Sequence, residues 1–169
     1  MDMRSFFISV LAGALLAAAP AAAETNQFYS RYFGKHGNVC YARHYDAAHL
    51  AQHPRQKVQQ IALAFSPGRT QTAAAFEVKL GIVAKGSARR FSSPASCTSR
   101  EDGVVCKVEG DGGTFELRSR GAGMMLQVVG DGLRMEGTTF FEAGGAASDD
   151  NLFALPPAAW SQCRVARGP

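Results

Sequence analysis

The sequence lacks the patterns that most readily identify an enzyme or an integral membrane protein. It contains no Gly-x-Ser-x-Gly motif, on which many serine hydrolases hold their nucleophile. It contains no Cys-x-x-Cys pair, which makes a zinc site built from its cysteines improbable. Beyond residue 18 it has no apolar run near the length of about 20 residues that a membrane-spanning helix needs. We therefore expect a protein that is not an enzyme and has no membrane span.

The one long apolar run lies at the start of the chain and is typical of an export signal. Arg4 is followed by an apolar segment over 6–18, then by Pro20 and three alanines that end at residue 23. This order of charged, apolar and small residues predicts a secretory signal over 1–23. No cysteine follows the cleavage point, so a lipid anchor is not expected. The remaining chain, 24–169, has 146 residues (169 − 23) and is expected to be one periplasmic or secreted domain.

The charge of the chain is mildly basic and evenly spread. After removal of residues 1–23, the chain has 17 Lys and Arg against 13 Asp and Glu, a net charge of +4. Nucleic-acid-binding proteins concentrate such residues on one face, so no nucleic-acid partner is expected. A weak attraction to an anionic cell envelope fits this charge.

Four cysteines in an exported chain predict two disulfide bonds. Cys97 and Cys106 flank a polar segment over 99–103, a spacing that suits a bridge across a hairpin. Cys40 and Cys163 would then join the first strand to the C-terminal tail. The chain-entropy model gives such a long loop a stabilisation of about 4 kcal/mol.

Most of the remaining sequence alternates between apolar and polar residues, the period of a half-buried strand. Glycine-rich turns, such as 110–113 and 130–132, separate the alternating segments. These segments are 39–43, 58–65, 76–82, 103–109, 115–118, 124–128, 133–135, 140–141 and 152–155. The pattern predicts a mainly β protein: a single small antiparallel β-barrel, or a sandwich, of about eight strands. Only 46–52 is expected to form a helix, capped by Asp46 and ended by Pro54.

Three of the four histidines lie within 40–54, which reads CYARHYDAAHLAQHP. His49 and His53 are four residues apart and would share one face of a continuous helix. Asp46 and His44 could complete a site for Zn²⁺ or Cu²⁺. The alternatives are a structural corner, in which the imidazoles bond to backbone carbonyls, and an oriented base paired with Asp46.

Two further segments carry candidate functional residues. Asp149 and Asp150 are paired carboxylates in a glycine- and serine-rich segment, which is typical of a turn; Ca²⁺ binding or a general-acid role is the alternative. The arm 24–38 is rich in aromatic residues, which could pack on one end of the barrel. Alternatively, Tyr29, Tyr32 and the nearby Arg43 could form a partner-binding surface, because Tyr and Arg are favoured in interface hot spots.

The pattern Cys-Tyr-x-Arg-x-Tyr-Asp-x-x-His-Leu-x-x-His-Pro over 40–54 is followed by Asp-Asp-x-x-Phe-x-Leu over 149–155 and by Cys163. In these residues the chain resembles a family of uncharacterised exported proteobacterial proteins, a resemblance that implies a compartment but no activity. In architecture alone it is similar to periplasmic lysozyme inhibitors. We therefore expect a non-enzymatic binding or inhibitor-like module that contacts an envelope protein or glycan. The alternative is a metal-binding protein that uses the 44–53 histidines. The sequence leaves the oligomeric state open.

Overall fold

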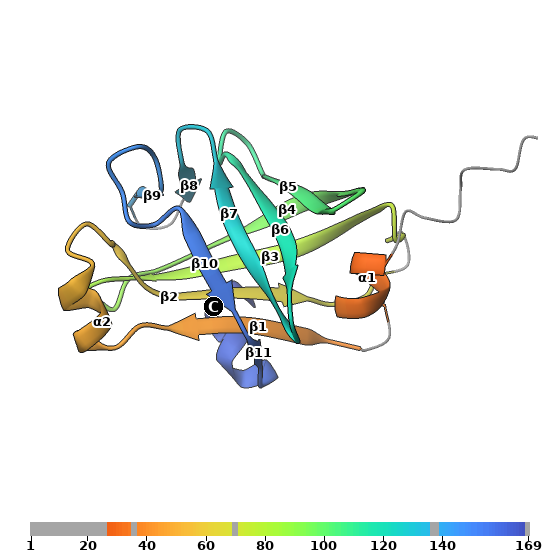
Figure 1. Cartoon of the computed structure of the whole chain (residues 1–169), viewed down its shortest axis with the longest axis horizontal. Helices are drawn as coiled ribbons and strands as arrows, with labels where there is room; N and C mark the ends of the chain where they lie inside the picture. The colour runs from red at the N-terminus through yellow and green to blue at the C-terminus, as the bar shows by residue number, and fades with distance from the viewer. Residues whose placement is uncertain (1–26, 35–36, 69–70, 136–138, 168–169) are drawn as a thin grey trace, which may run out of the picture.

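The computed structural model describes residues 27–34, 37–68, 71–135 and 139–167 (Figure 1). It confirms the predicted fold class: nine antiparallel strands form one nearly closed, barrel-like sheet. Two more strands form a small hairpin beside one end of the barrel. The predicted signal, 1–23, lies outside the described residues, as do Glu24 and His36.

The helices are short and the strands follow one another along the chain. The helical segments are α1 Gln27–Tyr32, α2 Ala47–Gln52, the 3-10 helix η1 Trp160–Cys163 and α3 Arg164–Arg167. The strands are β1 Val39–His44, β2 Val58–Phe65, β3 Ala75–Ala84, β4 Arg90–Arg100, β5 Gly103–Val108, β6 Thr114–Arg120, β7 Gly123–Val129, β8 Leu133–Met135, β9 Phe141–Ala143, β10 Leu152–Leu155 and β11 Pro157–Ala158. The order in the large sheet is β10-β7-β6-β5-β4-β3-β2-β1-β11, and β8 pairs with β9.

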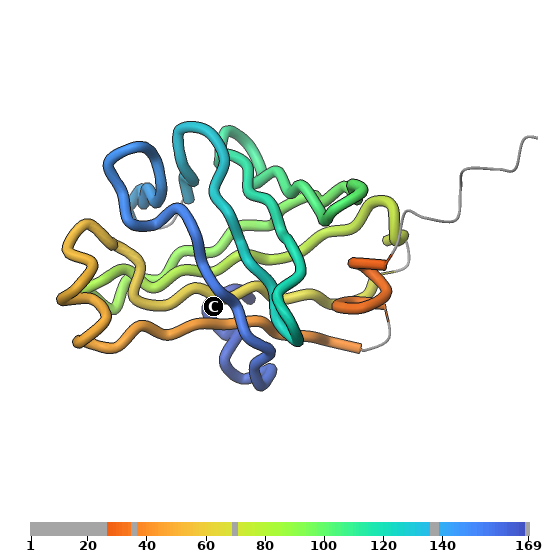
Figure 2. Tube along the Cα trace, in the orientation of Figure 1, coloured from red at the N-terminus to blue at the C-terminus, as the bar shows by residue number. Residues whose placement is uncertain are grey.

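The last strand segment closes the barrel. β10 pairs with β7, and β11, which begins two residues after β10 ends, pairs with β1 on the opposite edge of the sheet. Figure 2 shows this stretch of chain crossing from one edge to the other. Backbone N–H of Ala42 donates to the carbonyl of Pro156 at the crossing point, 3.1 Å away. One segment of about seven residues therefore joins both edges.

The core lies inside the barrel and continues to both of its ends. Alternate residues of β3, Phe76, Val78, Leu80 and Ile82, are buried there, as the period of two predicts. β2 is buried on both faces, because η1 and α3 cover its outer side. Gly81 allows this close approach: a Cβ at this position would lie 2.3 Å from the backbone nitrogen of Ala166.

Both predicted disulfides are present. Cys97 and Cys106 are directly opposite each other on β4 and β5, with their Cα atoms 4.0 Å apart. Cys40 and Cys163 join β1 to η1 across a sequence separation of 123 residues. The second bridge fixes the C-terminal segment on the outside of the barrel.

The longest strand, β4, was not predicted from the sequence. β4 has eleven residues, from Arg90 to Arg100, and pairs along its length with β3 and β5. It is rich in serine and contains Pro94, residues that are depleted in strands, so its composition resembles a loop. Proline has no backbone N–H to donate, and here the missing donor falls just beyond the end of β5, where the regular ladder stops and the Pro94 carbonyl still accepts from the Glu109 N–H.

Candidate functional site

The histidine segment forms a corner at one end of the barrel, where β1 turns into α2 (Figure 1). Asp46 caps α2: its Oδ1 accepts from the backbone N–H of His49 at 2.8 Å. The cap satisfies one of the N–H groups that a helix leaves without an internal partner. This confirms the predicted helix and its cap. It also means that one oxygen of the Asp46 carboxylate is already engaged.

The imidazoles of this corner are stacked rather than convergent. The His49 ring lies between Tyr45 and His53, with ring centroids 4.5 Å and 4.3 Å away. Nε2 of His49 is within hydrogen-bond distance of Gln56 Oε1, 3.1 Å away. Imidazole lone pairs lie in the ring plane, so nearly parallel stacked rings direct their nitrogens side by side instead of at one point between them.

The described residues contain no group of three or more His, Cys, Asp or Glu side chains that could hold a metal ion. His44, at the end of β1, is exposed, and His49 stacks with Tyr45 on one side and with His53 on the other. The structure therefore does not assemble His44, Asp46, His49 and His53 into the predicted Zn²⁺ or Cu²⁺ site. It matches the structural corner that was the alternative, although His49 bonds to a glutamine side chain rather than to a backbone carbonyl.

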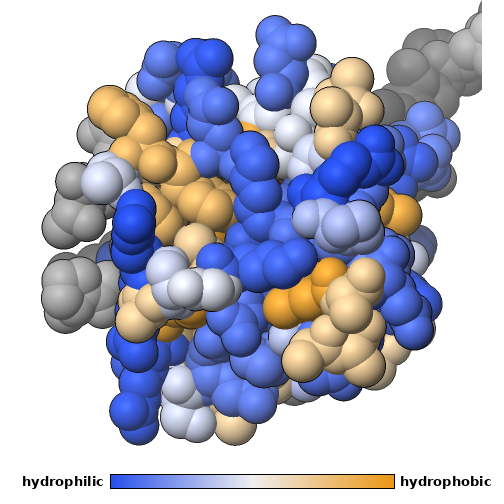
Figure 3. Space-filling model, turned by 90° about the vertical axis from the view of Figure 1, so that its left-hand side faces the viewer, coloured by the Kyte–Doolittle hydropathy of each residue, from blue (hydrophilic) through white to orange (hydrophobic). Residues whose placement is uncertain are grey.

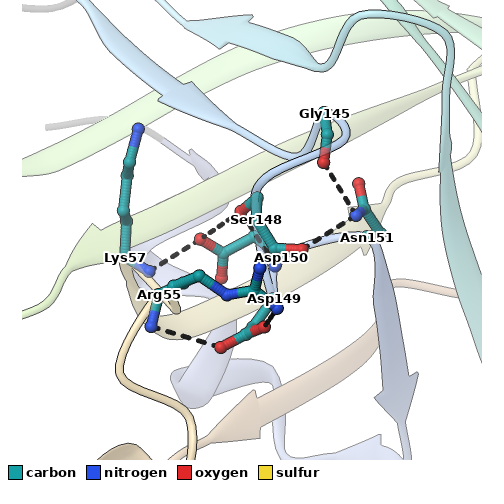
Figure 4. Close-up of polar contacts among 7 residues, drawn as sticks. All are labelled: Arg55, Lys57, Gly145, Ser148, Asp149, Asp150 and Asn151. Atoms are coloured by element: carbon teal, nitrogen blue, oxygen red, sulfur yellow. Dashed lines mark hydrogen bonds and ion pairs between the residues drawn. The ribbon is translucent and has the colours of Figure 1, made fainter.

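Asp150 is the most unusual residue at this end of the barrel, because its carboxylate is fully buried (Figure 4). Its Oδ2 accepts from the backbone N–H of Lys57 at 2.7 Å, and its Oδ1 accepts from that of Val58 at 3.2 Å. Ser148 Oγ lies 3.4 Å from Oδ2 and donates to it. Burial raises the pKa of Asp150 above its usual value, and the three hydrogen bonds, which favour the carboxylate, oppose that rise.

Asp149 points away from its neighbour and has a different partner (Figure 4). Its Oδ1 forms an ion pair with the Arg55 guanidinium at 2.8 Å, and its Oδ2 accepts from the Arg55 backbone N–H at 3.2 Å. Because the two carboxylates have separate partners, they do not form a joint Ca²⁺ site or an acid–base pair. Together they fasten the segment before β10 to the segment before β2.

Tyr45 completes the buried part of this corner. Burial is the main cause that raises the pKa of Tyr45 to about 12; Arg43 lowers it and Asp150 raises it further. At neutral pH this phenol therefore keeps its proton.

Figure 3 views this end of the molecule: hydrophilic residues cover most of it, and the hydrophobic surface is divided into separate patches. The corner has the features of a structural junction.

The opposite end of the barrel is closed by α1 (Figure 1). Tyr32, predicted to contact a partner, is only 1% exposed; its hydroxyl donates to the carbonyl of Gly121 at 3.1 Å. Tyr29 is half-buried against Phe65 and Phe76. The prediction of a partner surface is therefore wrong for Tyr32, and the alternative prediction, that the aromatic residues of this segment pack on one end of the barrel, is confirmed for it. Of the three predicted residues, Arg43 is the exposed one.

Arg43 lies at the place where the barrel is not fully closed. The pairing of β1 with the closing segment ends at Ala42, and beyond it a cleft of about 280 Å³ opens between β1, β10 and the β6–β7 turn. We call it the seam cleft. Its described lining residues are Arg43, Arg120, Ala122, Gly123, Met124, Ala154, Leu155, Pro156 and Pro157. Two arginines and no acidic side chain therefore line it.

Neither arginine of the seam cleft forms an ion pair with a carboxylate of the described residues. The Arg43 guanidinium lies 5.5 Å from the centroid of the Tyr45 ring, and Arg120 is 3.3 Å from Met125 Sδ. Sequence reasoning identified Arg43 but missed Arg120, since only the folded barrel brings these two residues, 77 positions apart, to one cleft.

No family model, curated protein or solved structure among those compared with this chain matches it. The two resemblances drawn from the sequence therefore remain predictions. Within the described ranges, no helix is long and apolar enough to cross a membrane.

Proposed function

We propose that the protein is an exported, non-enzymatic binding module that uses the seam cleft to hold an anionic group on an envelope protein or glycan. The observation that carries the proposal is the pair of exposed guanidiniums of Arg43 and Arg120 on one cleft without an acidic neighbour. An arginine binds a carboxylate or phosphate through two parallel N–H groups, which gives geometric specificity as well as charge.

The surroundings of the cleft suit such a role. Arg43 extends from β1, and Arg120 from the end of β6, so both guanidiniums are attached to strands rather than to free loops. The cation–π contact of Arg43 with Tyr45 restrains its side chain without neutralising the charge. A rigid, charged cleft loses less entropy on binding than a flexible one.

Export rests on two features of different kinds. The N-terminal 23 residues have the order of a secretory signal. The two disulfides fit an oxidising compartment, in which such bonds form and persist. In the bacterial periplasm, the partner surfaces that carry carboxylates and phosphates are the envelope glycans and envelope proteins themselves.

The proposal is tested by cosedimentation of the protein with isolated envelope polymers at several salt concentrations. We expect the Arg43→Gln/Arg120→Gln variant to lose at least about tenfold in affinity, because each charge-assisted hydrogen bond contributes about 1.5–3 kcal/mol. The matched control is Arg90→Gln/Arg118→Gln, which removes the same charge; Arg118 is paired with Glu116 outside the cleft. Equal losses in both variants would show attraction to net charge alone and would overturn the seam cleft as the site.

A further inference from the structure

A second pocket lies on the outside of the barrel, where the C-terminal segment crosses β2 and β3. Its volume is about 230 Å³, and it shares no lining residue with the seam cleft. We call it the outer pocket. Its described lining residues are Ala64, Ser66, Gln71, Glu77, Lys79, Trp160 and Arg167. Nothing in the proposed role of the seam cleft uses these residues.

The outer pocket is built on fixed elements. Trp160 starts η1, which the Cys40–Cys163 bridge fastens to β1. Glu77 and Lys79 extend from the outer face of β3, where they are exposed. Much of the pocket wall therefore comes from a strand and from a disulfide-bonded segment, which hold their geometry before any ligand arrives, and Ser66 and Gln71 add the connection between β2 and β3.

Gln71 supplies an unsatisfied polar atom. Its Oε1 is buried and has no hydrogen-bond partner among the described residues. Its Nε2 is 3.5 Å from the Ser66 carbonyl oxygen, to which it donates. Buried side-chain acceptors in folded proteins nearly always have a donor, because leaving one without a partner is unfavourable. Because Gln71 lines the outer pocket, a turn of its amide toward a bound ligand would let Oε1 accept from a ligand hydroxyl and gain the partner that it lacks.

The other groups of the pocket select the ligand. Trp160 is the only tryptophan of the chain and is half-buried; its indole packs against the apolar cluster around the Cys40–Cys163 bridge, and its exposed part can contact the apolar C–H groups of a sugar ring. Arg167 lies 4.9 Å from the indole centroid. With Lys79 it gives two positive charges against the one negative charge of Glu77. The pocket thus combines an aromatic surface, an acceptor and net positive charge.

We propose that the outer pocket binds a hexose that carries a carboxylate, as part of an acidic envelope glycan. The sugar ring packs beside Trp160, one hydroxyl donates to Gln71 Oε1, and the carboxylate accepts from Lys79 and Arg167. The inference extends the proposed binding role to a second place on the molecule, but it stands without the seam cleft.

Trp160 makes the test direct, because all indole fluorescence comes from this pocket. The probe is an oligosaccharide of alternating glucuronic acid and N-acetylglucosamine, compared with a neutral N-acetylglucosamine oligomer of equal length. We expect a saturable change of emission with the acidic probe and at least about tenfold weaker binding of the neutral one. Gln71→Leu should weaken binding of the acidic probe by about tenfold, the effect of one lost hydrogen bond. Lys79→Gln should weaken it as well.

The control variant is Gln162→Leu, which makes the same change on an exposed residue of η1 outside the pocket; its binding should equal that of the parent. Thermal unfolding of each variant verifies that it is folded. No saturable change at millimolar probe, equal binding of both probes, or unchanged binding by Gln71→Leu would each overturn the proposal. Arg43→Gln/Arg120→Gln should leave this titration unchanged, so failure of the seam cleft and failure of the outer pocket are distinguishable.

Discussion

The two ends of the barrel are closed in opposite ways. At one end, α1 places aromatic rings in the opening, where Phe33 packs within 6.1 Å, centroid to centroid, of Tyr41, Phe65 and Phe76. At the other end, the segments beside α2 are held by a buried carboxylate, Asp150, and by hydrogen bonds to backbone N–H groups. The first closure depends on the volume and apolar area of its side chains, and the second depends on the direction of a few bonds.

This difference between apolar packing and hydrogen bonding predicts which kind of substitution destabilises each end. Apolar packing is non-directional, so the aromatic end should respond to lost volume. A buried polar contact is directional, and removal of one partner leaves the other without a bond. One end of the barrel is thus stabilised by apolar packing, and the other by directional hydrogen bonds.

The largest effect is expected from Phe33→Ala at the aromatic end. The side chain is 1% exposed, and its loss would leave a cavity that costs about 3–5 kcal/mol. Urea unfolding of the two proteins measures the difference. Phe140→Ala is the matched control, because Phe140 is 79% exposed and should change the free energy of unfolding by less than about 0.5 kcal/mol. A Phe33→Ala loss as small as the control would contradict the packed end.

An intermediate effect is expected from Asp150→Ala at the polar end. The backbone N–H groups of Lys57 and Val58 would lose their acceptor, at a cost of about 2 kcal/mol. Asp149→Ala is the neighbouring control: its ion pair with the largely exposed Arg55 should contribute at most about 1 kcal/mol. Equal losses in the two variants, measured by urea unfolding, would contradict a special role for the buried carboxylate.

The difference in stability between the parent protein and Asp150→Ala should depend on pH. Burial raises the pKa of Asp150 above its ordinary value of 3.8, so the folded protein holds this proton more tightly than the unfolded chain does. The stability that this group contributes is therefore lost as the pH rises through that window, from 3.8 to the raised pKa. We expect the destabilisation by Asp150→Ala to be larger at about pH 4 than at about pH 7. A destabilisation that grows with pH would contradict the raised pKa.

The smallest effect is expected in metal binding at the α2 end. Calorimetric titration of the tag-free protein with Zn²⁺ and Cu²⁺ should give the same weak binding as a His49→Ala/His53→Ala variant. The reason is that the stacked rings of His49 and His53 do not direct their nitrogens to one point. Tight one-to-one binding that is lost in the variant would contradict this reading of the corner.

The hairpins and the disulfides could be predicted from the sequence because their signals are local. Gly110 and Gly130, in two predicted turns, both have positive φ angles, 68° and 74°, and the pairing of Cys97 with Cys106 follows from a short polar turn between them. β4 was missed because tertiary pairing on both sides overrides the low strand propensity of its serines and Pro94.

The candidate sites were harder to predict because their partners are distant in the sequence. The sequence predicts a turn at Asp150, which is present, but only the fold brings its carboxylate to Lys57 and Val58, 93 and 92 residues away. For Tyr32 the sequence left open whether the ring packs on the barrel or meets a partner, and only the fold places it in the core. Neither the seam cleft nor the outer pocket has a local pattern, because each is assembled from several elements.

The closing segment Leu152–Ala158 has a consequence for the order of events in folding. A chain emerges from the ribosome with its N-terminus first. The edges of β1 and β7 therefore exist before the segment that pairs with both of them, and so does Cys40 before Cys163. Until residues 152–158 arrive, both edges offer unpaired N–H and C=O groups to any neighbouring strand. The arrival of this one segment thus decides when both edges are protected from pairing with another chain.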